Sequence, residues 1–139
     1  MAFKFPDKDP DERLDYTVDW SRYLERDDLT ITAVRWSIEQ EGGSTDIFTE
    51  GYAFQKPVPT GATASANNLY SATDYSTVGL VNRRNVFDPN KGTATIVLDD
   101  GENNKVYTLV CEIDTSDSAK TNHSVTTNRR IKIKVRERV

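Results

Sequence analysis

The sequence predicts an all-β protein, an antiparallel β-sandwich with little helix. Several segments alternate apolar and polar residues with a period of two, as strands with one buried face do. No segment keeps an apolar period of 3.6 residues, which argues against long helices. Loops rich in Gly, Asn and Asp separate the candidate strands, and this arrangement favours two packed sheets.

The composition indicates one domain that folds without disulfide bonds. A chain of 139 residues can bury one hydrophobic core, and its single cysteine excludes an internal disulfide. Acidic residues outnumber basic ones by 22 to 18, so we expect no nucleic-acid partner, because nucleic-acid-binding domains are usually basic. The sequence has no apolar run near the ~18 residues of a membrane span and no signal-peptide stretch at its start. We therefore expect no membrane partner, and synthesis in the cytoplasm.

An extended N-terminal arm is expected over residues 1–13, followed by a single sandwich domain over residues 14–139. Pro6 and Pro10 oppose a regular element in the arm. Its alternating charges leave little apolar surface to bury, so we expect the arm to be disordered in the free protein and ordered against a neighbour. Phe3 and Phe5 are its candidate interface residues.

Two alternating segments predict the first strands of the domain. In the first, Leu14–Trp20, every second residue is apolar, starting from Leu14. Thr30–Ile38 alternates in the same way. Trp20 and Trp36 fall on the apolar faces of these strands, so we expect both rings in the core.

Residues 46–92 are expected to be a long excursion from the sandwich and not a second domain. About 45 residues without disulfides or a metal cannot usually build their own core. Loops of this length in a compact domain are often functional. Aromatic residues of the excursion are candidate interface anchors, with packing on the domain as the alternative; they are Tyr52, Phe54, Tyr70 and Tyr75.

The remaining strands are expected at Thr93–Leu98, at Val106–Ile113 and at the C-terminal end. Val106–Ile113 is apolar on both faces, which is typical of a central strand. The polar stretch Thr115–Thr127 is expected to be a loop.

The C-terminal strand, Asn128–Arg138, carries the most distinctive surface pattern of the chain. Three apolar residues, Ile131, Ile133 and Val135, alternate there with three cations, Lys132, Lys134 and Arg136. One face of the strand is therefore apolar and the other basic. Such a row either blocks unwanted strand pairing or docks an acidic neighbour, so its three cations are candidate interface residues.

No set of catalytic or metal-binding residues stands out. Cys111 is expected in mid-strand as a small buried hydrophobe, and the single His123 lies in a polar loop without a partner nucleophile. The spacing Asp7-x-Asp9-x-Asp11 resembles the start of a calcium loop, but the Gly and Glu that such a loop needs further on are absent. We expect no catalytic residue, no cofactor, no metal and no enzymatic activity.

Two parts of the sequence resemble a family of small bacteriophage virion proteins, the fibre–tail adaptors. The segment K-D-P-D-E-R-L-D-Y-T-V-D-W-S at Lys8–Ser21 is similar to their pattern K-D-P-x-E-x-L-D-Y-x-V-D-W. The tryptophan strand at Leu29–Ile38 and the ending R-x-I-x-I-x-V-x-E-R at Arg129–Arg138 are similar to later parts of the family. Residues 46–92 are longer than the family's middle, so the resemblance does not cover what they do.

The resemblance implies an immunoglobulin-like antiparallel β-sandwich that acts without catalysis, as an adaptor linking neck or tail proteins to tail fibres. It also implies that the partners are other virion proteins, that multiple copies form a ring, and that the protein resides in the virion tail or neck after synthesis in the bacterial cytoplasm. The alternative is another kind of virion module, either a capsid decoration domain or a carbohydrate-binding β-sandwich.

Overall fold

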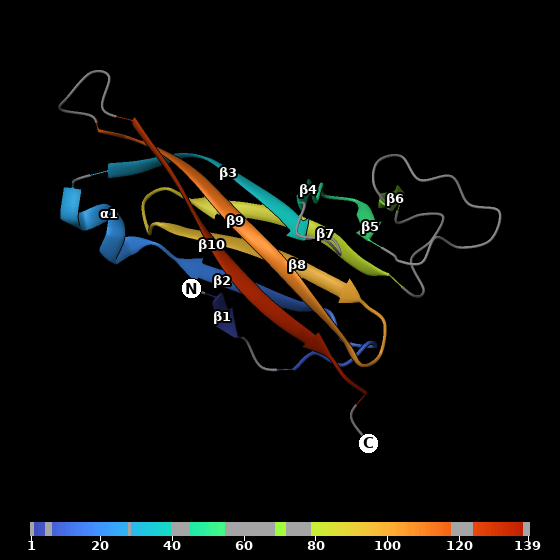
Figure 1. The fold of residues 1–139 in the computed structure, drawn as a ribbon. Helices are drawn as coiled ribbons and strands as arrows, with labels where there is room; N and C mark the ends of the chain where they lie inside the picture. The colour runs from blue at the N-terminus through green and yellow to red at the C-terminus, as the bar shows by residue number, and fades with distance from the viewer. Residues whose placement is uncertain are drawn as a thin grey trace.

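The computed structural model describes residues 2–4, 7–27, 29–39, 45–54, 69–71, 79–117 and 124–137. They form two five-stranded sheets that pack face to face, with one short helix at one end (Figure 1). The first sheet has the order β1 (Ala2–Lys4), β10 (Ser124–Val135), β9 (Lys105–Asp117), β3 (Leu29–Glu39) and β4 (Thr45–Ile47). The second sheet has the order β2 (Leu14–Asp19), β8 (Thr93–Asp100), β7 (Leu80–Asp88), β5 (Tyr52–Phe54) and β6 (Leu69–Ser71).

Neighbouring strands are antiparallel, except that β1 runs parallel to β10. The predicted class, an all-β immunoglobulin-like antiparallel β-sandwich, is confirmed by these two packed sheets. The period-two pattern explains why they pack. In β2, for example, Tyr16 and Val18 are buried while Asp15, Thr17 and Asp19 are exposed.

The core lies between the sheets and contains both tryptophans. Trp20 and Trp36 are each 2% exposed, as predicted from the alternation of their strands. Strand β10 contributes Ile131 and Ile133 to the same cluster of buried residues. The alternation of apolar and polar residues along these strands therefore predicted the core side chains correctly.

The prediction of a loop over Thr115–Thr127 is wrong where the structure describes that stretch. Strands β9 and β10 form a long hairpin whose register runs from Ser116 opposite Ser124 to Lys105 opposite Val135. The stretch is polar, but its backbone is paired across the hairpin, and the side chain of Thr115 is 1% exposed. Residues 118–123 lie outside the described residues.

The described parts of the segment 46–92 belong to the sandwich, in contrast to the predicted excursion. It contains β4, β5, β6 and β7, and β7 lies inside the second sheet between β8 and β5. The buried Asn82 of β7 also donates a hydrogen bond from its side-chain amide to the carbonyl of Phe48, at 2.8 Å. Backbone pairing and burial thus integrate the described part of this segment into the fold.

The helix α1 (Ser21–Asp27) closes one end of the sandwich (Figure 1). The Asp19 carboxylate accepts a hydrogen bond from the N–H of Ser21 at 2.9 Å and so caps the first turn. The backbone N–H of Trp20 donates to the carbonyl of Gly92 at 2.8 Å. A Cβ at Gly92, whose φ is 69°, would lie 2.8 Å from the Leu24 side chain, so the β7–β8 turn needs glycine there.

Candidate protein interface

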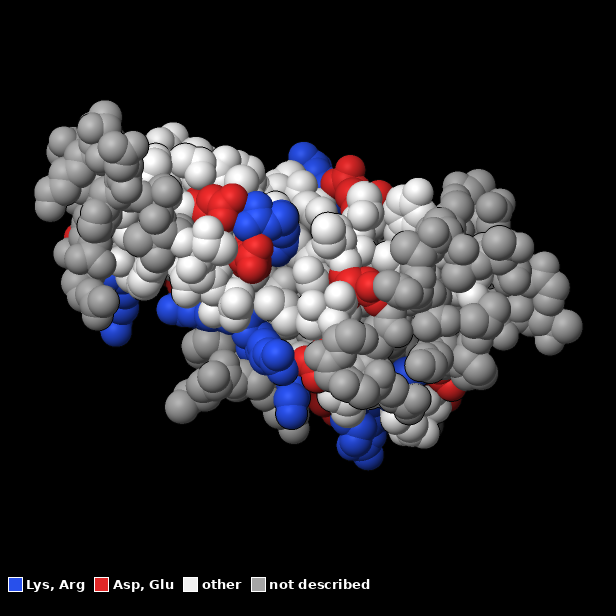
Figure 2. Space-filling model, turned by 45° about the horizontal axis from the view of Figure 1, so that its top comes forward, with Lys and Arg blue, Asp and Glu red and all other residues white. Residues whose placement is uncertain are grey.

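The outer face of the first sheet carries the basic row that the C-terminal strand predicts. In β10, Ile131, Ile133 and Val135 are fully buried. The alternating cations point away from the core: Lys132 and Arg136 are exposed and Lys134 is half-buried. Figure 2 shows a line of Lys and Arg side chains that runs diagonally across this face.

Beside the row, the same face carries a network of ion pairs across β3 and β9, centred on Arg35. The Arg35 guanidinium donates to Glu112 at 2.9 Å and to Asp114 at 2.7 Å. The hydroxyl of Thr126 also donates to Asp114, at 2.8 Å. These hydrogen bonds lower the pKa of the Asp114 carboxyl to about 2, and the bond from Arg35 makes the largest contribution. Positive and negative side chains are therefore interspersed over these strands (Figure 2).

The cations of the row differ from Arg35 and Arg130 on the same face in having no partner among the described residues. Arg130 pairs with Glu39 at 2.8 Å, across the intervening strand β9. The side chains of Lys132, Lys134 and Arg136 form no hydrogen bond or ion pair with any residue that the structure describes. Their charge is thus available to a partner, while Arg35 is already paired with Glu112 and Asp114 of the same chain.

Exposed apolar side chains accompany the charges, and the sequence pattern did not identify them. Val106 on β9 lies opposite Lys134 and is 53% exposed, although β9 is a central strand of its sheet, as predicted. Ile47 on the edge strand β4 is 62% exposed. Val106 is exposed because no described residue covers the outer face of the first sheet at this point. An apolar residue on a strand face that is otherwise polar was the available signal.

The predicted aromatic anchors do not form one exposed cluster. Phe54 is 3% exposed and packs edge-on against Tyr107, with ring centroids 6.4 Å apart. Tyr70 is 1% exposed, and Tyr52 is half-buried against the core. Phe54 and Tyr70 are thus core side chains, which agrees with the alternative of packing on the domain and not with a role as interface anchors. The side chain of Phe3, and the whole of Phe5 and Tyr75, lie outside the described residues.

The described part of residues 1–13 packs on its own domain, in contrast to the predicted disordered arm. Strand β1 pairs with β10, with Lys4 in register with Lys132. Further on, the N–H of Lys8 donates to the carbonyl of Lys134, and the N–H of Arg136 donates to the carbonyl of Lys8, both at 2.8 Å. The N-terminal segment therefore runs along the edge of β10.

The Lys8 side chain anchors this segment in an unusual way, because it is fully buried. Its ammonium donates to the carbonyl of Asp100 at 2.7 Å and to that of Asp9 at 2.9 Å. Burial lowers the pKa of Lys8, and nearby carboxylates, Asp99 first, oppose that shift. The sequence predicted a solvated arm here, since buried lysines are rare and no local pattern marks them.

The turn that follows Lys8 explains several residues of the family-like motif. The Asp9 N–H donates to the Glu12 carboxylate at 2.8 Å, and the Glu12 N–H donates back to the Asp9 carbonyl at 3.0 Å. Arg13 then pairs with Asp99 of β8 at 3.0 Å. Local hydrogen bonds and one ion pair thus hold the chain between Lys8 and β2.

The second sheet exposes acidic side chains on its own outer face. Asp15 and Asp19 point outward from the edge strand β2, and the Thr17 hydroxyl between them lies 2.8 Å from that of Thr95. Asp15 forms no hydrogen bond or ion pair with another described residue. The two outer faces therefore differ in sign along the strands β10 and β2.

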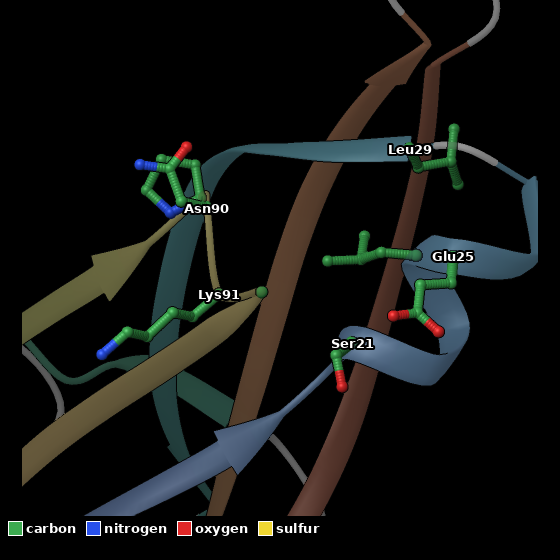
Figure 3. A pocket seen from close by; sticks show the side chains of 8 residues that line it. Ser21, Glu25, Leu29, Asn90 and Lys91 are labelled. Atoms are coloured by element: carbon green, nitrogen blue, oxygen red, sulfur yellow. The ribbon is translucent and has the colours of Figure 1, made fainter.

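A small open hollow lies between α1 and the β7–β8 turn. It has a volume of about 180 Å³, and its lining includes Leu24 and Leu29 together with polar side chains. Figure 3 shows Ser21 and Glu25 of α1 on one side, and Asn90 and Lys91 of the turn on the other. Nothing in this lining forms a catalytic set.

The residues considered for chemistry have no catalytic arrangement in the described part of the chain. Cys111 is fully buried, and burial raises the pKa of its thiol to about 12, so it is a poor nucleophile. Among the described residues, no group of His, Cys, Asp and Glu could hold a metal ion. His123 lies outside them. No helix of the described residues is long and apolar enough to cross a membrane.

The fold and the exposed charges of its outer faces define a class of protein, a β-sandwich module with charged outer faces. Residues 8–128 match the family described as podophage GP4 fiber-tail adaptor protein gp77, and the chain belongs to this family. Membership confirms the resemblance noted in the sequence. It implies a structural adaptor role in the phage tail, with contacts to other virion proteins.

Comparison with solved structures found a match to a domain of a human protein. The ASH/PapD-like domain 7 of human CEP192 is 11% identical, with a TM-score of 0.39, and the match covers 99% of this chain and 82% of that chain. No curated protein matches the sequence.

Proposed function

We propose that this protein links neck or tail proteins to the tail fibres of a phage virion, in multiple copies and without catalysis. The family match over residues 8–128 carries this proposal. The structure supports it with a rigid two-sheet body whose distinctive surface features are charges that lack partners within the described chain.

We assign the basic row of Lys132, Lys134 and Arg136 to contact with a neighbouring subunit in the virion. Buried side chains of β10 that alternate with these cations fix the backbone that presents them. A row of unpaired cations fits an acidic protein surface, because complementary charge speeds association and rejects wrong partners. Tyr52, half-buried at the rim, is the one predicted aromatic anchor whose described side chain retains exposure.

The adaptor role is tested in particles. Phage that lack this protein should assemble heads and tails but carry no fibres, and the protein supplied in trans should restore the fibres counted by electron microscopy. Gold labelling of a tagged copy should mark the tail. Fully fibred particles without the protein would refute the proposal. Label on the capsid shell would favour decoration instead, and glycan binding by the purified protein would favour a carbohydrate-binding module.

A further inference from the structure

The exposed charges along β10 and along β2 are opposite in sign. The first sheet presents Lys132, Lys134 and Arg136, and the second presents Asp15 and Asp19. Each row alternates with buried side chains, so the two rows point away from the core in opposite directions. Figure 1 shows β10 and β2 along the same side of the sandwich, in different sheets.

The two rows also match in length. Lys132 and Arg136 are separated by four residues, as are Asp15 and Asp19, and both pairs span about 13 Å at roughly 3.3 Å per residue. Each row is flanked by an uncharged strip on the neighbouring strand. Lys132 and Lys134 lie opposite Thr108 and Val106 of β9. The acidic row has the equivalent neighbours in β8, where Asp15 is opposite Val97 and Asp19 is opposite Thr93.

Asp19 of the acidic row keeps its charge at neutral pH. A hydrogen bond from Ser21 lowers the pKa of the Asp19 carboxyl, and Arg129 and Arg22 are its cationic neighbours. Asp15 forms no hydrogen bond or ion pair with another described residue, so its charge should attract a cation more strongly than the charge of Asp19 does.

We propose that copies of this protein associate face to back, with the basic row of one copy on the Asp15–Asp19 row of the next. This inference rests on the proposal that the adaptor acts in multiple copies. The contact joins two different surfaces of the same chain, so every copy offers one free surface for the next copy. Contacts of this kind close into a ring when the rotation between copies allows it.

The test uses the full chain in solution, by mass photometry and sedimentation velocity. Self-association should be measurable in about 0.1 M salt and lost in about 1 M salt, because the Debye length falls from roughly 10 Å to roughly 3 Å. K132E/R136E makes both faces acidic, and D15K/D19K makes both basic. Each variant alone should associate at least about tenfold more weakly than the wild type, because attractions become repulsions.

A mixture of the two variants is the decisive experiment. The contact is complementary again between unlike copies, so the mixture should form complexes that neither variant forms alone. The control is K91E, at an exposed cation of the β7–β8 turn that lies outside both rows. It should keep wild-type self-association. If D15K/D19K loses its cooperative melt because Asp19 caps α1, D15K alone replaces it.

Three results would overturn the proposal: a wild type that stays monomeric in low salt, a control that loses association as K132E/R136E does, or a mixture that shows no complexes. These failures are distinguishable from failure of the adaptor role. A monomeric protein whose absence still removes the fibres would leave the adaptor role intact and end the face-to-back contact alone.

Discussion

Replacing the buried Lys8 tests how the N-terminal segment is held. Its ammonium is the donor for the carbonyls of Asp100 and Asp9, at 2.7 and 2.9 Å. Lys8→Met keeps the apolar stem but removes this donor, and a buried acceptor left without a partner costs about 1–3 kcal/mol. Removal of a buried charge offsets part of that cost. We expect a net loss of about 2 kcal/mol, because the carboxylates around Lys8 also lose their cation.

A second substitution separates the polar contribution from the packing contribution. Lys8→Ala also removes three methylene groups from a fully buried stem. At about 0.8 kcal/mol for each methylene, it should cost about 2.4 kcal/mol more than Lys8→Met. The free energy of unfolding is measured by urea denaturation, with Lys91→Met, at an exposed lysine of the β7–β8 turn, as the control.

The control should change stability by less than about 0.5 kcal/mol. Hydrogen exchange should be faster at the backbone amides of positions 8 and 136 in both variants, because these amides hydrogen-bond the N-terminal segment to the C-terminal strand and the residue after it. A Lys8→Met protein as stable as the wild type would refute the reasoning, since the ammonium would then contribute no net stability.

Three further predictions concern the core and the ion pairs of Arg35. Trp36→Ala should lower the free energy of unfolding by about 3–5 kcal/mol, measured by denaturant titration, because a large buried side chain leaves a cavity; an unchanged midpoint would place the ring outside the core. The Cys111 thiol, fully buried with a pKa of about 12, should react with a thiol reagent only after denaturant is added, and rapid labelling of the folded protein would contradict this. The pKa of Asp114 is about 2 in the folded protein, below the ordinary 3.8, so its stabilising contribution is present above that ordinary value and lost as pH falls toward 2. Asp114→Asn should therefore reduce the acid sensitivity of the melting temperature in that window, and a wild-type slope in the variant would be evidence against the Arg35 pairing.

The sequence by itself determined the strands whose two faces differ in polarity. The alternation in β2, β3 and β10 places Tyr16, Trp36 and Ile131 in the core and Lys132 at the surface, as the structure shows. This information is local, because successive side chains of a strand point to opposite faces whatever the strand's partners are. The basic row could be predicted for the same reason.

Only the tertiary structure decided which polar segments are paired and which faces are covered. Strand β7 and the polar ends of β9 and β10 lack a clear alternation, and they are strands because distant backbone completes their hydrogen bonds. Whether Val106 is buried depends on what covers the first sheet, and whether Lys8 is buried depends on the carbonyl of Asp100, which is 92 residues away in the chain. Local sequence patterns carry no information about such long-range partners, so these features were decided by the packing of the complete sandwich.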